Sequence, residues 1–110
     1  MKAVEELLER IIAEAPSPRV TALHQNVPNP FNPSTTIRFD LERNGWVSLR
    51  VYDVAGRVVR TLVASELSAA RRSVVWDGRD DTGAFLGSGL YLYRLETGGF
   101  SLVRKTILLK

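Results

Sequence analysis

The sequence predicts a mainly β protein, a single antiparallel β-sandwich of about seven strands preceded by a short helix. Apolar and polar residues alternate with a period of two along much of residues 35–110. Turn-forming residues recur at intervals of roughly 8–12 residues, as in sandwich folds. The chain shows no strand–helix–strand alternation, which argues against a parallel α/β fold.

Residues 1–15 are expected to form an amphipathic helix that Pro16 ends. Such a short helix is marginal in isolation and needs a partner: the following domain, a second copy, or a neighbour missing from this sequence. The region is therefore interpreted as fused or oligomerising. Its apolar stripe consists of Val4, Leu7, Leu8, Ile11, Ile12 and Ala15.

Residues 16–34 contain all five prolines and are expected to form a stiff, non-helical connector. The only histidine, His24, lies here with no carboxylate or serine close in sequence, so we interpret it as a surface residue without a role.

Residues 35–110 supply the predicted sandwich. The pair Asn44-Gly45 predicts a type I′ hairpin between the first two strands, because both central residues of that turn need a positive φ. A second turn, Asp53–Gly56, places Gly56 in the left-handed region before a strand at Val58–Val63, whose inward face the pattern does not assign. The alternating apolar residues of the first two strands are Ile37, Phe39 and Leu41, then Val47, Leu49 and Val51.

Further strands are predicted at Ser73–Trp76 and, briefly, at Phe85–Leu86. The last hairpin joins Leu90–Glu96 to Phe100–Leu109. If Gly98-Gly99 is a two-residue loop, the paired residues are Leu95 with Leu102, Tyr93 with Arg104, and Tyr91 with Thr106; a bulge would exchange the two faces. Both faces are partly apolar, so the hairpin is expected to be central or covered at one end.

The composition excludes several classes of function. The absence of cysteine removes disulfides, thiolate zinc sites and cysteine nucleophiles. No apolar run is long enough to span a bilayer, and the first residues lack a signal-peptide core, so the chain as given is expected to be soluble without direct membrane insertion. Residues 1–15 carry a net charge of −2 and the remainder +5. The cations are scattered apart from the adjacent pairs Arg71-Arg72 and Arg104-Lys105, which argues against nucleic-acid binding.

Reactive chemistry is not expected either. The sequence contains no Ser/His/Asp constellation, no phosphate-binding loop and no histidine cluster, so we predict no enzyme activity and no cofactor. Asp77, Asp80 and Asp81 could supply oxygen ligands to calcium, but they lack the Asp-x-Asp-x-Asp-Gly register. A turn whose aspartates accept backbone N–H bonds explains the same residues, and we predict no metal site.

Four ordered sequence blocks resemble a known family. The chain is similar to the type A C-terminal sorting domains of the type IX secretion system, and more specifically to the immunoglobulin-like domain of flagellar hook-capping proteins. The resemblance covers about residues 23–110, and its blocks are Gln25–Ile37, Tyr52–Val59, Val75–Gly83 and Ser88–Tyr91, with a late lysine at Lys105.

The resemblance implies an immunoglobulin-like fold and a non-enzymatic role. Secretion translocon components would recognise the domain in the periplasm and deliver attached cargo to the outer-membrane surface or the exterior. The recognition residues are expected to be Pro28, Asn29, Pro30 and Phe31, with Arg104, Lys105 and Lys110 as candidate translocon contacts. Phe31 is expected to pack against the sandwich edge, and the motif either is recognised or only covers an edge strand. The residues expected to shape turns and structure are Tyr52, Asp53, Gly56, Trp76, Asp77, Gly78, Gly89 and Tyr91.

A second interpretation stays open. The alternative expectation is a structural interaction module of the hook-capping or adhesive kind, which forms a homo-oligomer through residues 1–15. Sorting domains follow a signal peptide and a large cargo, whereas here an acidic amphipathic segment occupies that position. The chain is then either an excised domain with a fused helix or a short natural protein without an export route.

Overall fold

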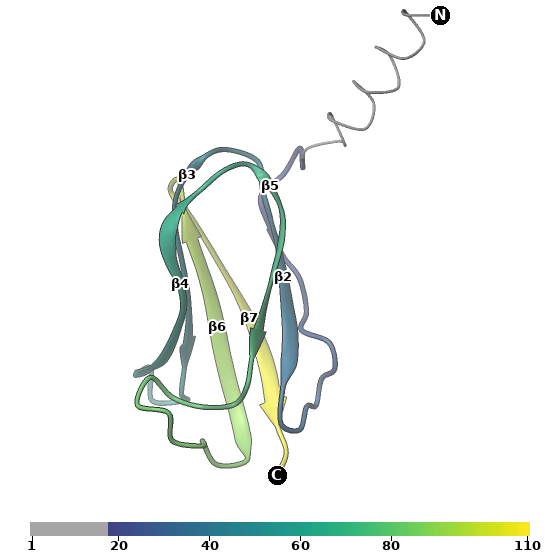
Figure 1. The fold of residues 1–110 in the computed structure, drawn as a ribbon, viewed down its shortest axis with the longest axis vertical. Helices are drawn as coiled ribbons and strands as arrows, with labels where there is room; N and C mark the ends of the chain where they lie inside the picture. Colours follow the sequence, from purple (N-terminus) through teal and green to yellow (C-terminus); the bar gives the residue numbers. More distant parts are fainter. Residues whose placement is uncertain (1–17) are drawn as a thin grey trace, which may run out of the picture.

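The computed structural model describes residues 18–110, and the helix predicted over residues 1–15 lies outside them. The described part is an immunoglobulin-like β-sandwich of seven antiparallel strands in two sheets (Figure 1). None of its elements is a helix with the length and apolar character needed to cross a bilayer. The strands are β1 (Ala22–Leu23), β2 (Thr35–Leu41), β3 (Gly45–Tyr52), β4 (Val58–Leu67), β5 (Ala70–Trp76), β6 (Gly89–Thr97) and β7 (Phe100–Leu108).

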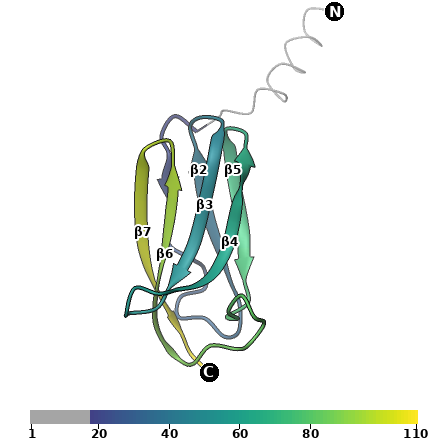
Figure 2. The ribbon, with the colours of Figure 1, turned by 90° about the vertical axis from the view of Figure 1, so that its left-hand side faces the viewer.

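The two sheets pack face to face around one apolar core. One sheet has the strand order β1-β2-β5 and the other β4-β3-β6-β7, the second lying in front in Figure 2. Alternate residues of the central strands point inward, so period-two sequences bury one face of each sheet. The buried core consists of Leu23, Phe31, Ile37, Phe39, Leu41, Val47, Leu49, Val51, Trp76, Tyr91, Tyr93, Leu95 and Leu108.

Two of the predicted turns are confirmed. The β6–β7 hairpin has the expected two-residue loop, with φ values of 52° at Gly98 and 84° at Gly99. Its pairing places Tyr93 opposite Arg104 and Tyr91 opposite Thr106, as predicted. Gly56 has a φ of 85° in the turn between β3 and β4. Strand β6 is central and β7 lies at an edge.

The predicted hairpin at Asn44-Gly45 is wrong. Strands β2 and β3 belong to different sheets, and neither Asn44 nor Gly45 has a positive φ. Alternation shows which face of a strand is buried but not which sheet contains the strand. The apolar faces of β2 and β3 meet across the core, so the chain crosses between layers at this point.

The strand predicted at Phe85–Leu86 is also wrong. It is reduced to a single bridge between Arg79 and Phe85 within the loop between β5 and β6. Two other strands are longer than predicted: β4 continues to Leu67 and β5 begins at Ala70.

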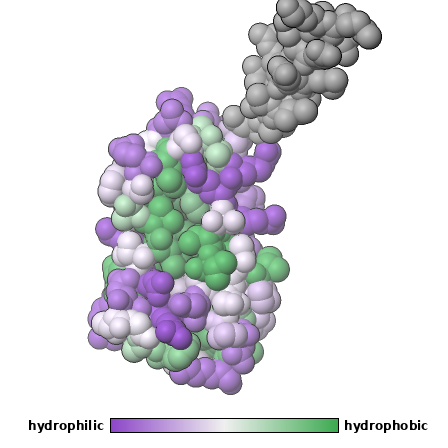
Figure 3. Space-filling model, in the orientation of Figure 1, coloured by the Kyte–Doolittle hydropathy of each residue, from purple (hydrophilic) through white to green (hydrophobic). Residues whose placement is uncertain are grey.

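The sandwich has one open side. Strands β4 and β5 each pair with only one neighbour and lie opposite each other across the two sheets. Figure 3 faces this side and shows an apolar area in its middle. The partly buried apolar residues that β4 and β5 contribute to the core are Val59, Leu62, Val63, Leu67 and Val74.

Candidate functional site

The segment that carries the Pro-Asn-Pro-Phe motif runs along the outer edge of β7. The Gln25 Nε2 donates to the Lys105 carbonyl at 2.6 Å. Further along, the Ile107 N–H donates to the Asn29 Oδ1 at 3.0 Å. These bonds satisfy β7 backbone groups that an edge strand would otherwise leave to solvent or to another chain. The segment is non-helical, as expected, and it forms the border of the sandwich.

Asn26 fixes this segment from inside. It is 1% exposed, and its Nδ2 donates to the Thr106 Oγ1 at 2.6 Å. The same nitrogen lies 3.0 Å from the Thr35 Oγ1 and 3.1 Å from the Pro28 carbonyl. A buried amide with these partners joins β2, β7 and the motif in one polar network. Because a buried polar group without a partner destabilises the folded state, the network holds the motif segment in one position.

Tyr93 completes the network from the central strand β6. Its hydroxyl donates to the His24 carbonyl at 2.6 Å and accepts from the Asn26 N–H at 2.8 Å. Burial raises the pKa of Tyr93 to about 12. The phenol therefore stays protonated at neutral pH and acts as a structural donor.

Phe31 attaches the end of the motif to the body of the domain. Its side chain is 2% exposed, and its ring centroid lies 5.2 Å from that of Trp76. Its N–H donates to the Ile107 carbonyl and its carbonyl accepts from the Leu109 N–H, both at 3.0 Å. Phe31 thus packs at the β7 edge of the sandwich, as the sequence predicts, and its ring reaches the core.

The rest of the motif faces outward. Pro28, Asn29 and Pro30 are exposed, although their backbone lies between the two buried anchors Asn26 and Phe31. Just beyond the motif, a shallow hollow of about 250 Å³ opens at the same end of the sandwich. It is lined by Asn32, Pro33, Asp77, Gly78, Phe85, Leu86, Leu108 and Lys110.

Gly78 allows the motif segment to approach this loop. A Cβ at this position would lie 3.0 Å from the Pro33 carbonyl oxygen, and the φ of Gly78 is +75°. Any other residue would therefore be strained in its own backbone and would press on the motif segment.

The three predicted basic contacts do not form one cluster. The Arg104 Nε donates to the Leu23 carbonyl at 2.9 Å and so holds β1 beside β7. Lys105 pairs with Leu92 and points to the outer face of the four-stranded sheet. Lys110 lies at the hollow, where its N–H donates to the Ser88 Oγ at 2.8 Å. Of the three, only Lys110 lines the hollow beyond the motif.

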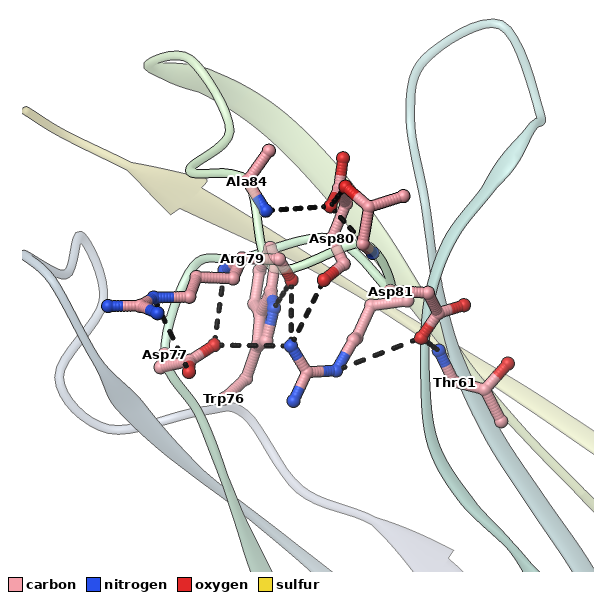
Figure 4. Close-up of polar contacts among 9 residues, drawn as sticks. Thr61, Trp76, Asp77, Arg79, Asp80, Asp81 and Ala84 are labelled. Atoms are coloured by element: carbon pink, nitrogen blue, oxygen red, sulfur yellow. Dashed lines mark hydrogen bonds and ion pairs between the residues drawn. The ribbon is translucent and has the colours of Figure 1, made fainter.

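The aspartates of the loop between β5 and β6 bind the loop itself (Figure 4). The Asp80 Oδ1 accepts from the Thr82 hydroxyl at 2.6 Å, the Thr82 N–H at 2.9 Å and the Ala84 N–H at 3.0 Å. The hydrogen bond from the Thr82 hydroxyl, followed by those from backbone N–H groups, lowers the pKa of Asp80. The loop is thus a turn whose aspartate accepts backbone N–H bonds, with all three hydrogen bonds on one carboxylate oxygen.

Asp77 and Asp81 connect the same loop to β4. The Asp77 Oδ1 accepts from the Arg60 Nη1 at 3.3 Å and from the Arg79 N–H at 3.1 Å. The Asp81 Oδ1 accepts from the Thr61 N–H at 3.0 Å. Within residues 18–110, no group of three or more His, Asp or Glu side chains is placed to hold a metal ion.

Trp76 and Tyr91 form the floor beneath this loop. The Trp76 Nε1 donates to the Arg79 carbonyl at 3.0 Å, and its ring meets that of Tyr91 edge-on at 5.6 Å. The Tyr91 hydroxyl donates to the Gly87 carbonyl at 2.7 Å, just before Gly89 begins β6. Both aromatic residues thus serve the packing of the motif and the loop.

The block that begins at Tyr52 shapes the β3–β4 turn. The Asp53 Oδ1 accepts from the N–H groups of Ala55 and Arg57, each at 3.0 Å, and these bonds lower the pKa of Asp53, with the Arg57 N–H as the largest cause. Tyr52 points outward, and the Arg94 guanidinium lies 5.3 Å from its ring centroid.

His24, expected to be a surface residue without a role, has a side-chain partner in the structure. Its Nε2 lies 2.8 Å from the Asp40 Oδ2, a residue 16 positions away. Sequence inspection could not find this pair, because β1 has two residues and gives no periodic pattern. The pair borders a hollow of about 370 Å³ with Arg38, Arg71, Arg72 and Ser73.

Comparisons with known proteins place this geometry in context. The model of the FlgD Ig-like domain matches residues 31–99. A crystal structure of dimeric latent PorU from Porphyromonas gingivalis is similar with a TM-score of 0.66 and 24% identity, covering 82% of this chain and 9% of that one.

A second similar structure is PorZ, described as an essential bacterial surface component of the type IX secretion system of human oral-microbiomic Porphyromonas gingivalis. Its TM-score is 0.56 with 20% identity, covering 81% of this chain and 12% of PorZ. At these identities the two structures share the fold alone. No curated protein sequence matches the chain. The family model, in contrast, covers more than half of the sequence, and the chain belongs to the FlgD Ig-like domain family.

Proposed function

We propose that this chain is a non-enzymatic sorting domain that the type IX secretion machinery recognises in order to deliver attached cargo to the cell surface. One observation carries the proposal: the exposed Pro28-Asn29-Pro30 surface lies between two buried anchors, Asn26 and Phe31. A surface held in one conformation binds with little loss of conformational entropy. It can therefore serve as a recognition element without any reactive group.

The similarity to PorZ supports the same proposal. PorZ is described as a surface component of the type IX secretion system, and its fold is similar to that of this chain. The four motif blocks of the sequence agree with that assignment. Under this proposal the partners are translocon components and the attached cargo, with no role for nucleic acid or direct membrane insertion. The domain would pass through the periplasm toward the outer-membrane surface or the exterior.

The proposal is tested by fusing residues 16–110 behind a signal peptide and a reporter in a bacterium that has the secretion system. Delivery is measured as reporter exposed to a protease added outside the cell. We expect surface delivery that is lost when the system is disabled. Retention of a folded, full-length reporter in the periplasm would overturn the proposal.

A matched set of variants separates recognition of the motif from its role in covering β7. Pro28→Ala with Pro30→Ala changes the exposed part of the motif, both its two rings and the backbone angles that the prolines fix, whereas Phe31→Ala removes a buried ring. If the motif is recognised, the double variant lowers delivery by more than its change in melting temperature explains, as judged against Phe31→Ala. Ser34→Ala, also exposed and close by, is the control. Delivery that follows melting temperature alone would assign the motif to edge covering.

A second function is favoured by the family match over residues 31–99. The FlgD Ig-like assignment supports a structural interaction module of the hook-capping or adhesive kind. Periplasmic retention of the reporter in the fusion experiment would favour this function.

A further inference from the structure

The outer face of the four-stranded sheet is more apolar than a solvent-facing sheet surface usually is. Leu90 is 41% exposed, Val103 47% and Ile107 39%. Direct pairing places Leu90 beside Ile107 and Tyr52 beside Leu92. We define the outer patch as Tyr52, Leu90, Leu92, Val103 and Ile107, which lie on β3, β6 and β7 (Figure 2).

Cations border the outer patch. Arg50 lies directly opposite Arg94, and Lys105 lies opposite Leu92. Arg94 has Glu96 3.7 Å away, but the side chains of Arg50 and Lys105 have no hydrogen bond or ion pair within residues 18–110. Like charges placed opposite each other destabilise a sheet. An acidic partner would relieve this repulsion while covering the apolar side chains.

The N-terminal segment has the complementary pattern in its sequence. Residues 2–15 predict a helix with an apolar stripe that includes Leu8 and Ile11. At about 100° per residue, Glu5 and Glu14 border this stripe on its two sides. The charge of residues 1–15 is −2, against +5 for the rest of the chain. The apolar stripe of the segment thus matches the apolar side chains of the outer patch, and its acidic border matches the cations around that patch.

We propose that the outer patch binds residues 2–15 of a second copy of this chain. Thr21 shares a hollow with Gly98 and Phe100 at the β6–β7 turn, so the segment joins the sandwich at that end. Pro16 and Pro18 bias the residues before them toward extended conformations, which disfavours a tight reversal of the chain onto its own sheet. In a two-fold dimer each copy supplies one segment and one patch, which doubles the buried area.

A membrane as the ligand of the segment, or the open side of the sandwich as its binding surface, fits less well. A membrane surface favours a basic polar face on an amphipathic helix, whereas this one is acidic. The open side between β4 and β5 is a second apolar surface that could bind the segment, but its cations Arg60 and Arg72 already have partners. Arg60 pairs with Asp77, and Arg72 donates to the Ser68 carbonyl and hydroxyl.

The test measures the molar mass of the full chain by size-exclusion chromatography with light scattering, from low to high micromolar concentration. We expect a dimer whose dissociation constant rises at least about tenfold in Val103→Lys and in Ile11→Lys. Val75→Lys is the matched control, because Val75 is a 60% exposed valine on β5 of the other sheet. Circular dichroism verifies that each variant is folded.

A charge exchange provides a second, independent measurement. Arg50→Glu with Lys105→Glu is expected to weaken the dimer, and adding Glu5→Lys with Glu14→Lys is expected to restore it. A full chain that is monomeric at every concentration would overturn the proposal. So would a dimer that Ile11→Lys leaves intact, or one that Val75→Lys weakens as much as Val103→Lys. These measurements use purified protein and do not depend on the secretion proposal.

Discussion

The two sides of the sandwich manage their exposed strand edges in different ways. At β7 the chain covers the edge with its own motif segment, through Gln25, Asn29 and Phe31. At β4 and β5 no further strand is present in the described part of the chain. The β7 edge is protected from pairing with another chain by buried contacts, whereas the β4 and β5 edges are protected by local features that make strand addition unfavourable. Mutations on the covered side should therefore lower stability, whereas mutations on the open side should mainly lower resistance to aggregation.

The open side carries three such features. A register shift between Leu49 and Arg50 of β3 leaves an extra residue on β4. Arg72 lies opposite Phe39 on the inner face of β5, where a charge opposes the approach of another sheet. The Asp81 N–H donates to the Val59 carbonyl at 3.0 Å, which occupies part of the β4 edge.

The largest effect is expected on the covered side, from Phe31→Ala. Removing a fully buried aromatic ring leaves a cavity beside Trp76 and should lower the free energy of unfolding by about 3–5 kcal/mol. Urea denaturation measures this change. Phe85→Ala is the control, because Phe85 is 57% exposed and should lose far less. Equal losses would mean that Phe31 does not hold the edge.

Asn26→Ala should have the next largest effect. The substitution removes the donor that the Thr106 and Thr35 hydroxyls accept from, and we expect a loss of about 1–3 kcal/mol. Asn29→Ala removes one exposed acceptor of the same edge and should cost less. The two unfolding curves compare a buried contact with an exposed one, and the reverse ranking would contradict the network described above.

Tyr93 gives the covered side a dependence on alkaline pH. Its pKa is about 12 in the folded state, against about 10 for an unfolded tyrosine. Between these values the folded state holds one more proton than the unfolded state, so its stability falls as pH rises. Below pH 10 the contribution is complete. Tyr93→Phe should be less stable at neutral pH and should lose less between pH 10 and 12. Parallel slopes in the two proteins would contradict this.

The smallest effect on stability is expected on the open side, from Arg72→Val. We expect a change of less than about 1 kcal/mol in the free energy of unfolding, because the lost hydrogen bonds to Ser68 are exposed. Light scattering during incubation at elevated temperature should nevertheless rise, since the charge that opposes strand addition is gone. Arg38→Val on the central strand β2 is the control and should not aggregate faster.

Local patterns predicted much of this molecule. The β6–β7 register followed from one two-glycine loop, since a loop of fixed length determines every pairing along the hairpin. Asp53 and Gly56 marked their turn because the carboxylate and the positive φ act within four residues. These features depend on contacts close in sequence.

Long-range features could not be predicted in the same way. The Asn44-Gly45 pair resembles a hairpin turn, but the choice between one sheet and two depends on how the faces of β2 and β3 meet. Asn26 gave no signal as a network centre, because its partner Thr106 lies 80 positions away. The Pro-Asn-Pro-Phe motif was visible in the sequence, whereas its attachment to β7 required the fold.

The attachment of the motif to β7 has a consequence for when the domain can form. Gln25 and Asn26 bond to residues 80 positions later, and Phe31 pairs with the backbone around Leu108. Contacts this distant in sequence form slowly. During synthesis, which proceeds from the N-terminus, these partners are made last. Any protein translated ahead of this domain would therefore be complete before the domain reaches its stable state.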